Sequence, residues 1–121
     1  MRLFNELVID QYVRGTAEVV SPPQWNELLG RADDLVYEVE VEESTGTSPT
    51  ITIRHLQSNS GKKFVGLANL INAAAIDNLP FRDIKTQAGP LGGLGQVGVQ
   101  LGASSGTPTA RVRIWACGRA K

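Results

Sequence analysis

Two similar stretches, STGTSPTITI at Ser44–Ile53 and SSGTPTARVRI at Ser104–Ile114, decide which fold this chain can adopt. Each begins with a loop rich in serine and threonine that holds one glycine and one proline, and each continues with alternating apolar and polar residues. Glycine accepts a positive φ, and proline ends a loop without needing a ladder hydrogen bond. We therefore predict a turn followed by a β-strand at both places.

The segments that precede the two loops alternate in the same way. DLVYEVEVEE, residues 34–43, puts its apolar side chains on one face and Glu38, Glu40 and Glu42 on the other, and QVGVQLGA, residues 96–103, repeats the pattern. A period of two indicates a half-buried strand. Each loop is therefore predicted to join the two strands of a hairpin.

Alignment of the two copies at Pro49 and Pro108 supports this reading. The inward positions of the two outgoing strands then coincide, pairing Ile51 with Ala110, Ile53 with Val112 and His55 with Ile114.

The other segments are predicted from weaker patterns. Strands are expected at 3–9, 13–21 and 80–87, and a flexible connection at 88–95. Residues 64–76 suit a strand followed by a loop, with a helix as the alternative. SPPQWNELLGRADD, residues 21–34, predicts one short helix that Ser21 caps and that stops near Gly30.

These elements predict an all-β fold in one domain, residues 1–121. Two hairpins and several further strands cannot each bury one face in a single open sheet. We therefore expect an antiparallel β-sandwich of jelly-roll-like form with one short helix.

Composition narrows the classes of function. Lysine and arginine number 12, as do aspartate and glutamate, so the net charge is zero and nucleic acid is not an expected partner. Cys117 is the single cysteine, which rules out an intrachain disulfide and a cysteine zinc site. We predict neither an export signal nor a membrane span.

No catalytic, cofactor-binding or metal-binding residue is predicted. His55 is interpreted as a packed structural histidine, with a small enzyme centred on it as an alternative. The three glutamates of residues 34–43 are interpreted as a solvated face rather than calcium ligands. Gly93, Gly95 and Gly98 match GxGxxG, but they run into a strand, whereas a dinucleotide fingerprint follows a strand and opens a helix.

Four residues are the predicted interaction residues: Phe4, Trp25, Arg113 and Trp115. Tryptophan and arginine are enriched in binding hot spots, and an exposed tryptophan can also stack on a sugar. Packing within the core or the sheet is the alternative role for the two tryptophans. Cys117 is interpreted as a small packing residue.

Two stretches of the sequence resemble a known family of proteins. TGTSPTITIRHLQSNSGKKFVGL at 45–67 resembles a pattern in small structural proteins of tailed bacteriophages and related phage-like elements, and GTPTARVRIWACGR at 106–119 is similar to their closing hairpin. The resemblance implies a non-enzymatic virion structural protein that decorates or cements the capsid shell, with a minor capsid or tail component as other roles.

The same resemblance implies the partners and the location. The major capsid protein or other virion proteins would be the partners, the chain would form a homo-oligomer, and it would fold in the bacterial cytoplasm before joining the virion. A glycan-binding β-sandwich module that uses Trp25 or Trp115 as a stacking platform is the alternative function.

Overall fold

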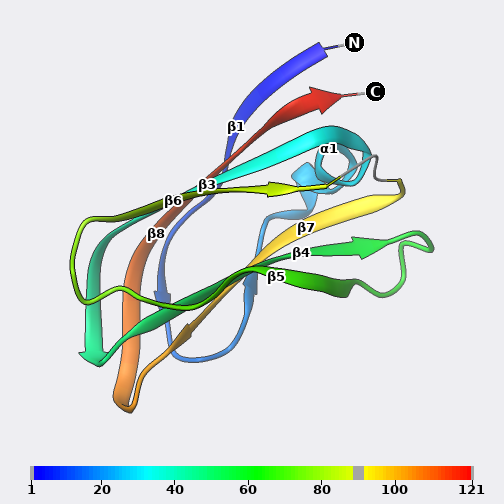
Figure 1. The fold of residues 1–121 in the computed structure, drawn as a ribbon. Coiled ribbons are helices and arrows are strands. Elements are labelled where there is room, and N and C mark those ends of the chain that lie inside the picture. The colour runs from blue at the N-terminus through cyan, green and yellow to red at the C-terminus, as the bar shows by residue number, and fades with distance from the viewer. Residues whose placement is uncertain (1, 89–91, 121) are drawn as a thin grey trace.

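Two four-stranded antiparallel sheets form the fold (Figure 1). The computed structural model describes residues 2–88 and 92–120. The elements in chain order are β1 (Arg2–Arg14), β2 (Val19–Val20), the 3-10 turn η1 (Pro23–Trp25), α1 (Asn26–Arg31), β3 (Ala32–Thr47), β4 (Thr50–Ser58), β5 (Val65–Ala75), β6 (Phe81–Gln87), β7 (Leu94–Gly102) and β8 (Ser105–Ala120).

The strand order is that of a jelly roll. Sheet A has the order β1-β8-β3-β6 and sheet B the order β2-β7-β4-β5. The pairs β1/β8, β3/β6, β2/β7 and β4/β5 are thus nested, as when one long hairpin is rolled into a sandwich. This arrangement confirms the predicted all-β, jelly-roll-like sandwich with one short helix.

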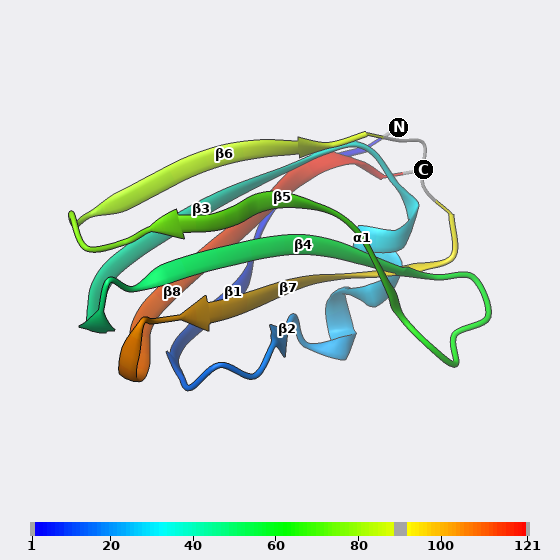
Figure 2. The same ribbon diagram turned by 60° about the horizontal axis from the view of Figure 1, so that its bottom comes forward.

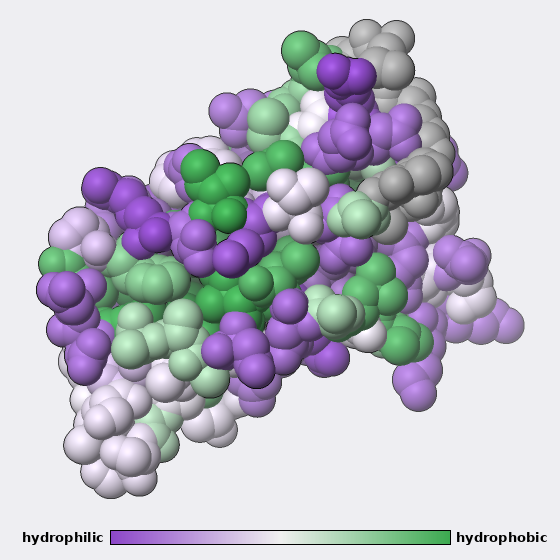
Figure 3. Space-filling view, viewed as in Figure 1, coloured by the Kyte–Doolittle hydropathy of each residue, from purple (hydrophilic) through white to green (hydrophobic). Residues whose placement is uncertain are grey.

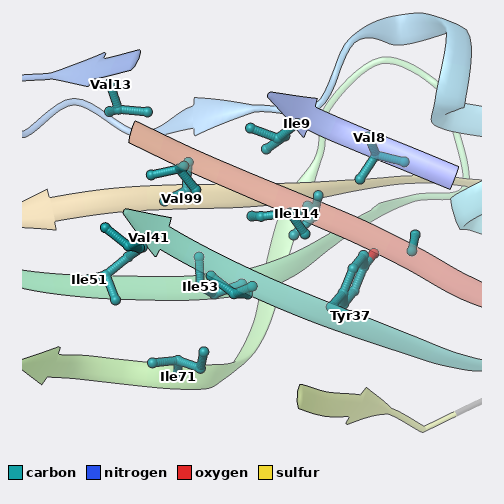
Figure 4. Close-up of a cluster of buried hydrophobic side chains, with 14 of the residues drawn as sticks. Val8, Ile9, Val13, Tyr37, Val41, Ile51, Ile53, Ile71, Val99 and Ile114 are labelled. Carbon is teal, nitrogen blue, oxygen red and sulfur yellow. The ribbon is translucent and has the colours of Figure 1, made fainter. Parts of the chain in front are cut away.

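The core lies between the two sheets, where alternation predicted it. Four residues of β3 that share a face are at most 1% exposed, and the matching residues of β4, β7 and β8 are equally buried. Figure 4 shows side chains from both sheets meeting there. Members of this cluster include Val8, Ile9, Val13, Tyr37, Val41, Ile51, Ile53, Ile71, Val99 and Ile114.

The two repeated loops do not form hairpins, and that prediction was wrong. β3 belongs to sheet A and β4 to sheet B, while β7 belongs to sheet B and β8 to sheet A. Each loop is therefore a corner at which the chain crosses from one sheet to the other. Because β3 pairs with β8 and β4 with β7, the two corners lie side by side at one end of the sandwich (Figure 2).

Matching hydrogen bonds explain why the two corners share a sequence. Both prolines are buried, and the carbonyl of Pro49 accepts from Ile76 N at 3.0 Å while that of Pro108 accepts from Gly15 N at 2.8 Å. Gly46 and Gly106 have φ of 110° and 77°, a region that favours glycine.

Direct hydrogen bonds tie the corners to each other. Ser104 N donates to Thr47 O at 2.9 Å, and the hydroxyls of Thr45 and Thr109 are hydrogen-bonded. The repeated phrase thus builds two equivalent corners that support one another.

The predicted helix is present, but its start differs. Ser21 does not cap it: the Ser21 hydroxyl accepts from Val97 N at 3.1 Å, and Ser21 N donates to Val97 O, so this residue extends the β2/β7 pairing. The helix stops near Gly30 as predicted, since α1 ends at Arg31. A Cβ on Gly30 would lie 2.5 Å from Leu94 Cα. Close packing on β7, rather than a stop signal, accounts for this glycine.

The remaining strand predictions are mostly confirmed. β5 covers 65–75, so residues 64–76 do not form a helix, and β6 matches the strand expected at 80–87. The strand expected at 13–21 is present only at its two ends, as the end of β1 and the short β2. The predicted connection at 88–95 lies partly outside the described residues, and its last two residues already belong to β7.

Candidate interaction surface

The single histidine lies in a buried hydrogen-bond chain between the sheets. His55, from β4, is 0% exposed, and its Nδ1 lies 2.7 Å from the hydroxyl of Tyr37 in β3. Its Nε2 lies 2.8 Å from Oε1 of Gln57, whose amide nitrogen reaches Gly30 O at 3.5 Å. With Gln57 oriented so, His55 Nε2–H donates to Gln57 and Tyr37 O–H donates to His55 Nδ1.

This series of hydrogen bonds is suited to stabilising the fold rather than to catalysis. Burial lowers the pKa of His55, although the hydrogen bond to Gln57 opposes that shift. Burial also raises the pKa of the Tyr37 hydroxyl. Both groups therefore stay neutral near pH 7, both ring nitrogens are engaged, and the imidazole is closed to a substrate.

The other sequence motifs also have structural explanations. Among the described residues, no group of three or more His, Cys, Asp and Glu side chains is placed to hold a metal ion. The GxGxxG glycines lie in and beside β7, where they permit close packing: a Cβ on Gly95 would lie 2.7 Å from the Leu29 carbonyl carbon. Close packing thus accounts for Gly95 without a phosphate ligand.

The outer face of sheet A carries an ion-pair network that crosses all four strands. Arg113 Nη1 of β8 lies 2.8 Å from Glu42 and 3.3 Å from Glu40, both on β3. Its Nε lies 3.4 Å from Asp10 of β1, and Arg82 of β6 reaches Glu40 at 2.9 Å. Arg111 also pairs with Asp10, so three arginines meet three carboxylates.

The network changes the role of Arg113. The hydrogen bond to Glu42 is the main cause that raises the pKa of Arg113, and the hydrogen bond from Arg82 lowers the pKa of Glu40. The guanidinium lies on the outer face of sheet A, and its charge is already balanced by carboxylates of the same chain. Arg113 therefore helps to order this face, and its role in contact with a partner stays a prediction.

An apolar surface adjoins the network, toward the two ends of the chain. Register places Leu7, Trp115, Glu38 and Ile84 in one row across the sheet, followed by a row with Cys117 and Val36. Leu3 is 74% exposed, Ile84 59% and Leu7 38%. We call this set the Trp115 surface; it consists of Leu3, Leu7, Val36, Ile84 and Trp115.

The remaining predicted residues lie elsewhere. Trp25 is in η1 and is partly buried against the core next to β7, so it and Trp115 belong to different layers and form no shared platform. Phe4 faces the interior and is 7% exposed, so it offers little surface. Cys117 is exposed rather than packed, on the outer face of sheet A.

Sequence reasoning missed Leu3, Leu7 and Ile84. Their alternation with inward residues was visible for β1 and β6, but the pattern alone does not say which strands lie beside Trp115. That knowledge requires the β1-β8-β3-β6 order, which pairs residues more than a hundred positions apart, such as Leu7 with Trp115.

Comparisons with known proteins bear on the fold. No family model and no curated protein sequence matches the chain. A crystal structure of the VP2 subviral particle of infectious bursal disease virus is similar, with a TM-score of 0.62 and 7% sequence identity. The match covers 98% of this chain and 33% of VP2, so the chain spans about a third of that protein. The chain shares its fold with part of VP2.

Within residues 2–88 and 92–120, no helix is long and apolar enough to cross a membrane.

Proposed function

We propose that this chain is a non-enzymatic structural protein of a virion that decorates or cements the capsid shell. The observation that carries the proposal is the jelly-roll topology, which extends over nearly the whole chain and is shared with part of a protein of a virus particle. Jelly rolls also occur in lectins and cupins, so the fold alone does not indicate a virion role. The surface of this chain has to provide the further support for the proposal.

The outer face of sheet A provides further support for a role in binding another protein. A self-neutralised ion-pair network holds four strands in register, and the adjacent Trp115 surface leaves apolar side chains in solvent. Exposed apolar clusters with a polar rim are typical of protein contacts, and tryptophan is a frequent anchor. We propose that this surface binds the major capsid protein or another shell protein of the virion.

A capsid shell presents many identical binding positions for the Trp115 surface. Many identical copies add up modest single-site contacts, so each copy needs only moderate affinity. The proposal includes assembly as a homo-oligomer, and folding in the cytoplasm of a bacterial host before incorporation.

The test compares virions with and without the chain. Mass spectrometry of purified particles should detect it, and particles that lack it should release their genome at a lower temperature. Purified chain added back should restore occupancy and stability. Absence from particles, or unchanged stability after deletion, would refute the proposal.

A matched pair of variants locates the contact. Leu7 and Val20 are each 38% exposed, but Leu7 lies in the Trp115 surface and Val20 lies on β2 of sheet B. Leu7→Glu should weaken binding to particles by about tenfold or more, whereas Val20→Glu should bind like the original chain. Equal loss in both variants would count against the Trp115 surface.

A glycan-binding module is the second candidate, because Trp115 lies on an open face between polar neighbours Arg113 and Glu38. A glycan array tests it directly. A hit that Trp115→Ala removes would support the module, and silence across the array would eliminate it.

A further inference from the structure

The free edge of sheet B is long and carries no charge. β5 has 11 residues and pairs with β4 on one side, while no described strand pairs with its other side. The opposite edge of the sheet, β2, has only two residues. An unpaired edge of this length is a place where another chain can attach.

Charged residues usually protect such edges, and here they are missing. β1 and β6, the edges of sheet A, carry charges such as Asp10 and Arg82. Residues 64–76, which we call the β5 strip, contain none. Nothing in the strip therefore repels a neighbouring protein electrostatically.

The β5 strip also exposes apolar side chains. Val65 is 57% exposed and Leu67 39%. Figure 3 shows hydrophobic surface on this side of the molecule, near β5 and β6. Leu70 and Ala74 of β5 and Phe81 of β6 are only partly buried against the core. The side of the sandwich at β5 and β6 is thus an apolar seam.

The backbone of β5 limits how a neighbour can attach. Its pairing with β4 shifts register three times, and Ala73 has a φ of 48° with its N–H donating to Thr52 Oγ1 at 3.0 Å. Bulges interrupt the outward hydrogen-bonding groups of an edge strand. A long added strand is therefore disfavoured, and contact must come mainly from side chains.

The residues that flank the β5 strip carry opposite charges at its two ends. Lys62 and Lys63 precede it and Asp77 follows it, and Lys63 and Asp77 are equally far along the sequence from Leu70. In an antiparallel pair centred on Leu70, the lysines of each copy would lie at the same end of the strip as the aspartate of the other copy. Opposite charges at both ends of a neutral strip favour this arrangement.

Side-chain size also differs between the two halves of the β5 strip. Two exposed residues of the first half, Val65 and Leu67, are large, and the exposed residues at their mirrored positions, Ala75 and Ala73, are small. Large groups would therefore meet small ones across a twofold axis, as close packing requires.

We infer that the β5 strip is the contact between two copies of this chain, related by a twofold axis with their β5 strands antiparallel. Lys62 and Lys63 of each copy pair with Asp77 of the other, and Val65 and Leu67 fill the space above the alanines. The Trp115 surface lies on the outer face of sheet A and stays free in this dimer.

Sedimentation equilibrium of the purified chain tests the contact. The original chain should have twice the monomer mass, and Leu67→Glu should dissociate it, with the dimer about 100-fold weaker because each substitution acts in both copies. Val20→Glu, the matched control on β2, should remain dimeric. A monomeric original chain, or a dimer that Leu67→Glu leaves intact, would overturn the inference.

A charge swap tests the antiparallel orientation. Asp77→Lys alone, or Lys62→Asp with Lys63→Asp, should each weaken the dimer, while the triple variant should restore it. Far-UV circular dichroism confirms that each variant is folded. Failure of the triple variant to restore the dimer, in a folded chain, would overturn the proposed orientation.

This dimer is a specific form of the homo-oligomer that the proposed function includes, and it is tested separately from particle binding. Particle binding is measured with Leu7→Glu and self-association with Leu67→Glu, so either proposal can fail while the other survives.

Discussion

Gly66 and Gly98 lie against the ion pair between Arg54 and Glu18 on the outer face of sheet B. Arg54 Nε lies 2.7 Å from Glu18 Oε2, and Nη2 lies 2.8 Å from Oε1, a bidentate pair that ties the segment before β2 to β4. A Cβ on Gly98 would lie 2.6 Å from Glu18 Oε2, and one on Gly66 would overlap Arg54. These glycines make room for the pair.

Replacement of Gly98 should therefore act through Glu18. Gly98→Ala pushes the carboxylate away and should lower the free energy of unfolding by no more than about 1 kcal/mol, because the obstacle is the end of a flexible side chain in a partly exposed ion pair. In a Glu18→Ala background the same replacement should cost much less. Urea denaturation of the four chains checks this, and equal costs in both backgrounds would show that Glu18 is not the obstacle.

At the scale of elements, α1 is held against β7 by glycines on both sides. A Cβ on Gly95 would lie 2.8 Å from Gly30 N, and one on Gly30 would lie 2.5 Å from Leu94 Cα. The backbones of helix and strand are thus nearly in contact, and Leu29 of the six-residue helix is fully buried.

Gly95→Ala should separate the two elements. We expect a loss of about 1–3 kcal/mol in the free energy of unfolding, because the clash is with backbone that cannot rotate away. Gly92 is the matched control, since a Cβ there would meet nothing within 4 Å. Thermal unfolding of both variants gives the comparison, and a stable Gly95→Ala variant would mean that α1 can move off β7 freely.

The corners show how far sequence alone predicts elements. Alternation identified the buried faces of β3, β4, β7 and β8, because a period of two reports which side chains are inside. It could not report which strands are neighbours, so two corners between sheets were predicted as hairpins. The partners of Arg113, on β1 and β3, were hidden for the same reason.

At the scale of the whole molecule, the two sheets meet through a buried polar contact between side chains of β3 and β4. Tyr37 and His55 meet across the interior at 2.7 Å, and Gln57 extends the chain of hydrogen bonds toward α1. A buried polar group keeps its hydrogen bonds only if both sheets stay in register. The sandwich is therefore sensitive to the protonation of His55.

The dependence of stability on pH follows from the lowered pKa of His55. Above its ordinary value of 6.5 the imidazole is neutral in both states, and the free energy of unfolding is constant with respect to this group. Below 6.5 the unfolded chain binds the proton first, so stability falls as pH falls, by up to about 1.4 kcal/mol per pH unit, until the folded-state pKa is reached. Glu40, whose pKa is lowered from 4.5, adds its own loss only at still lower pH.

Urea denaturation between pH 5 and 7.5 isolates the histidine, because this range spans the ordinary imidazole pKa of 6.5 and lies above the values of about 4 found for carboxyl groups in model peptides. The original chain should lose stability toward pH 5, and His55→Gln, whatever its stability at pH 7.5, should show a much flatter profile. Because His55 is the single histidine, no other imidazole contributes to the difference. Parallel profiles for the two chains would mean that the buried imidazole is not the group that titrates, and that the contact between the sheets tolerates a charge.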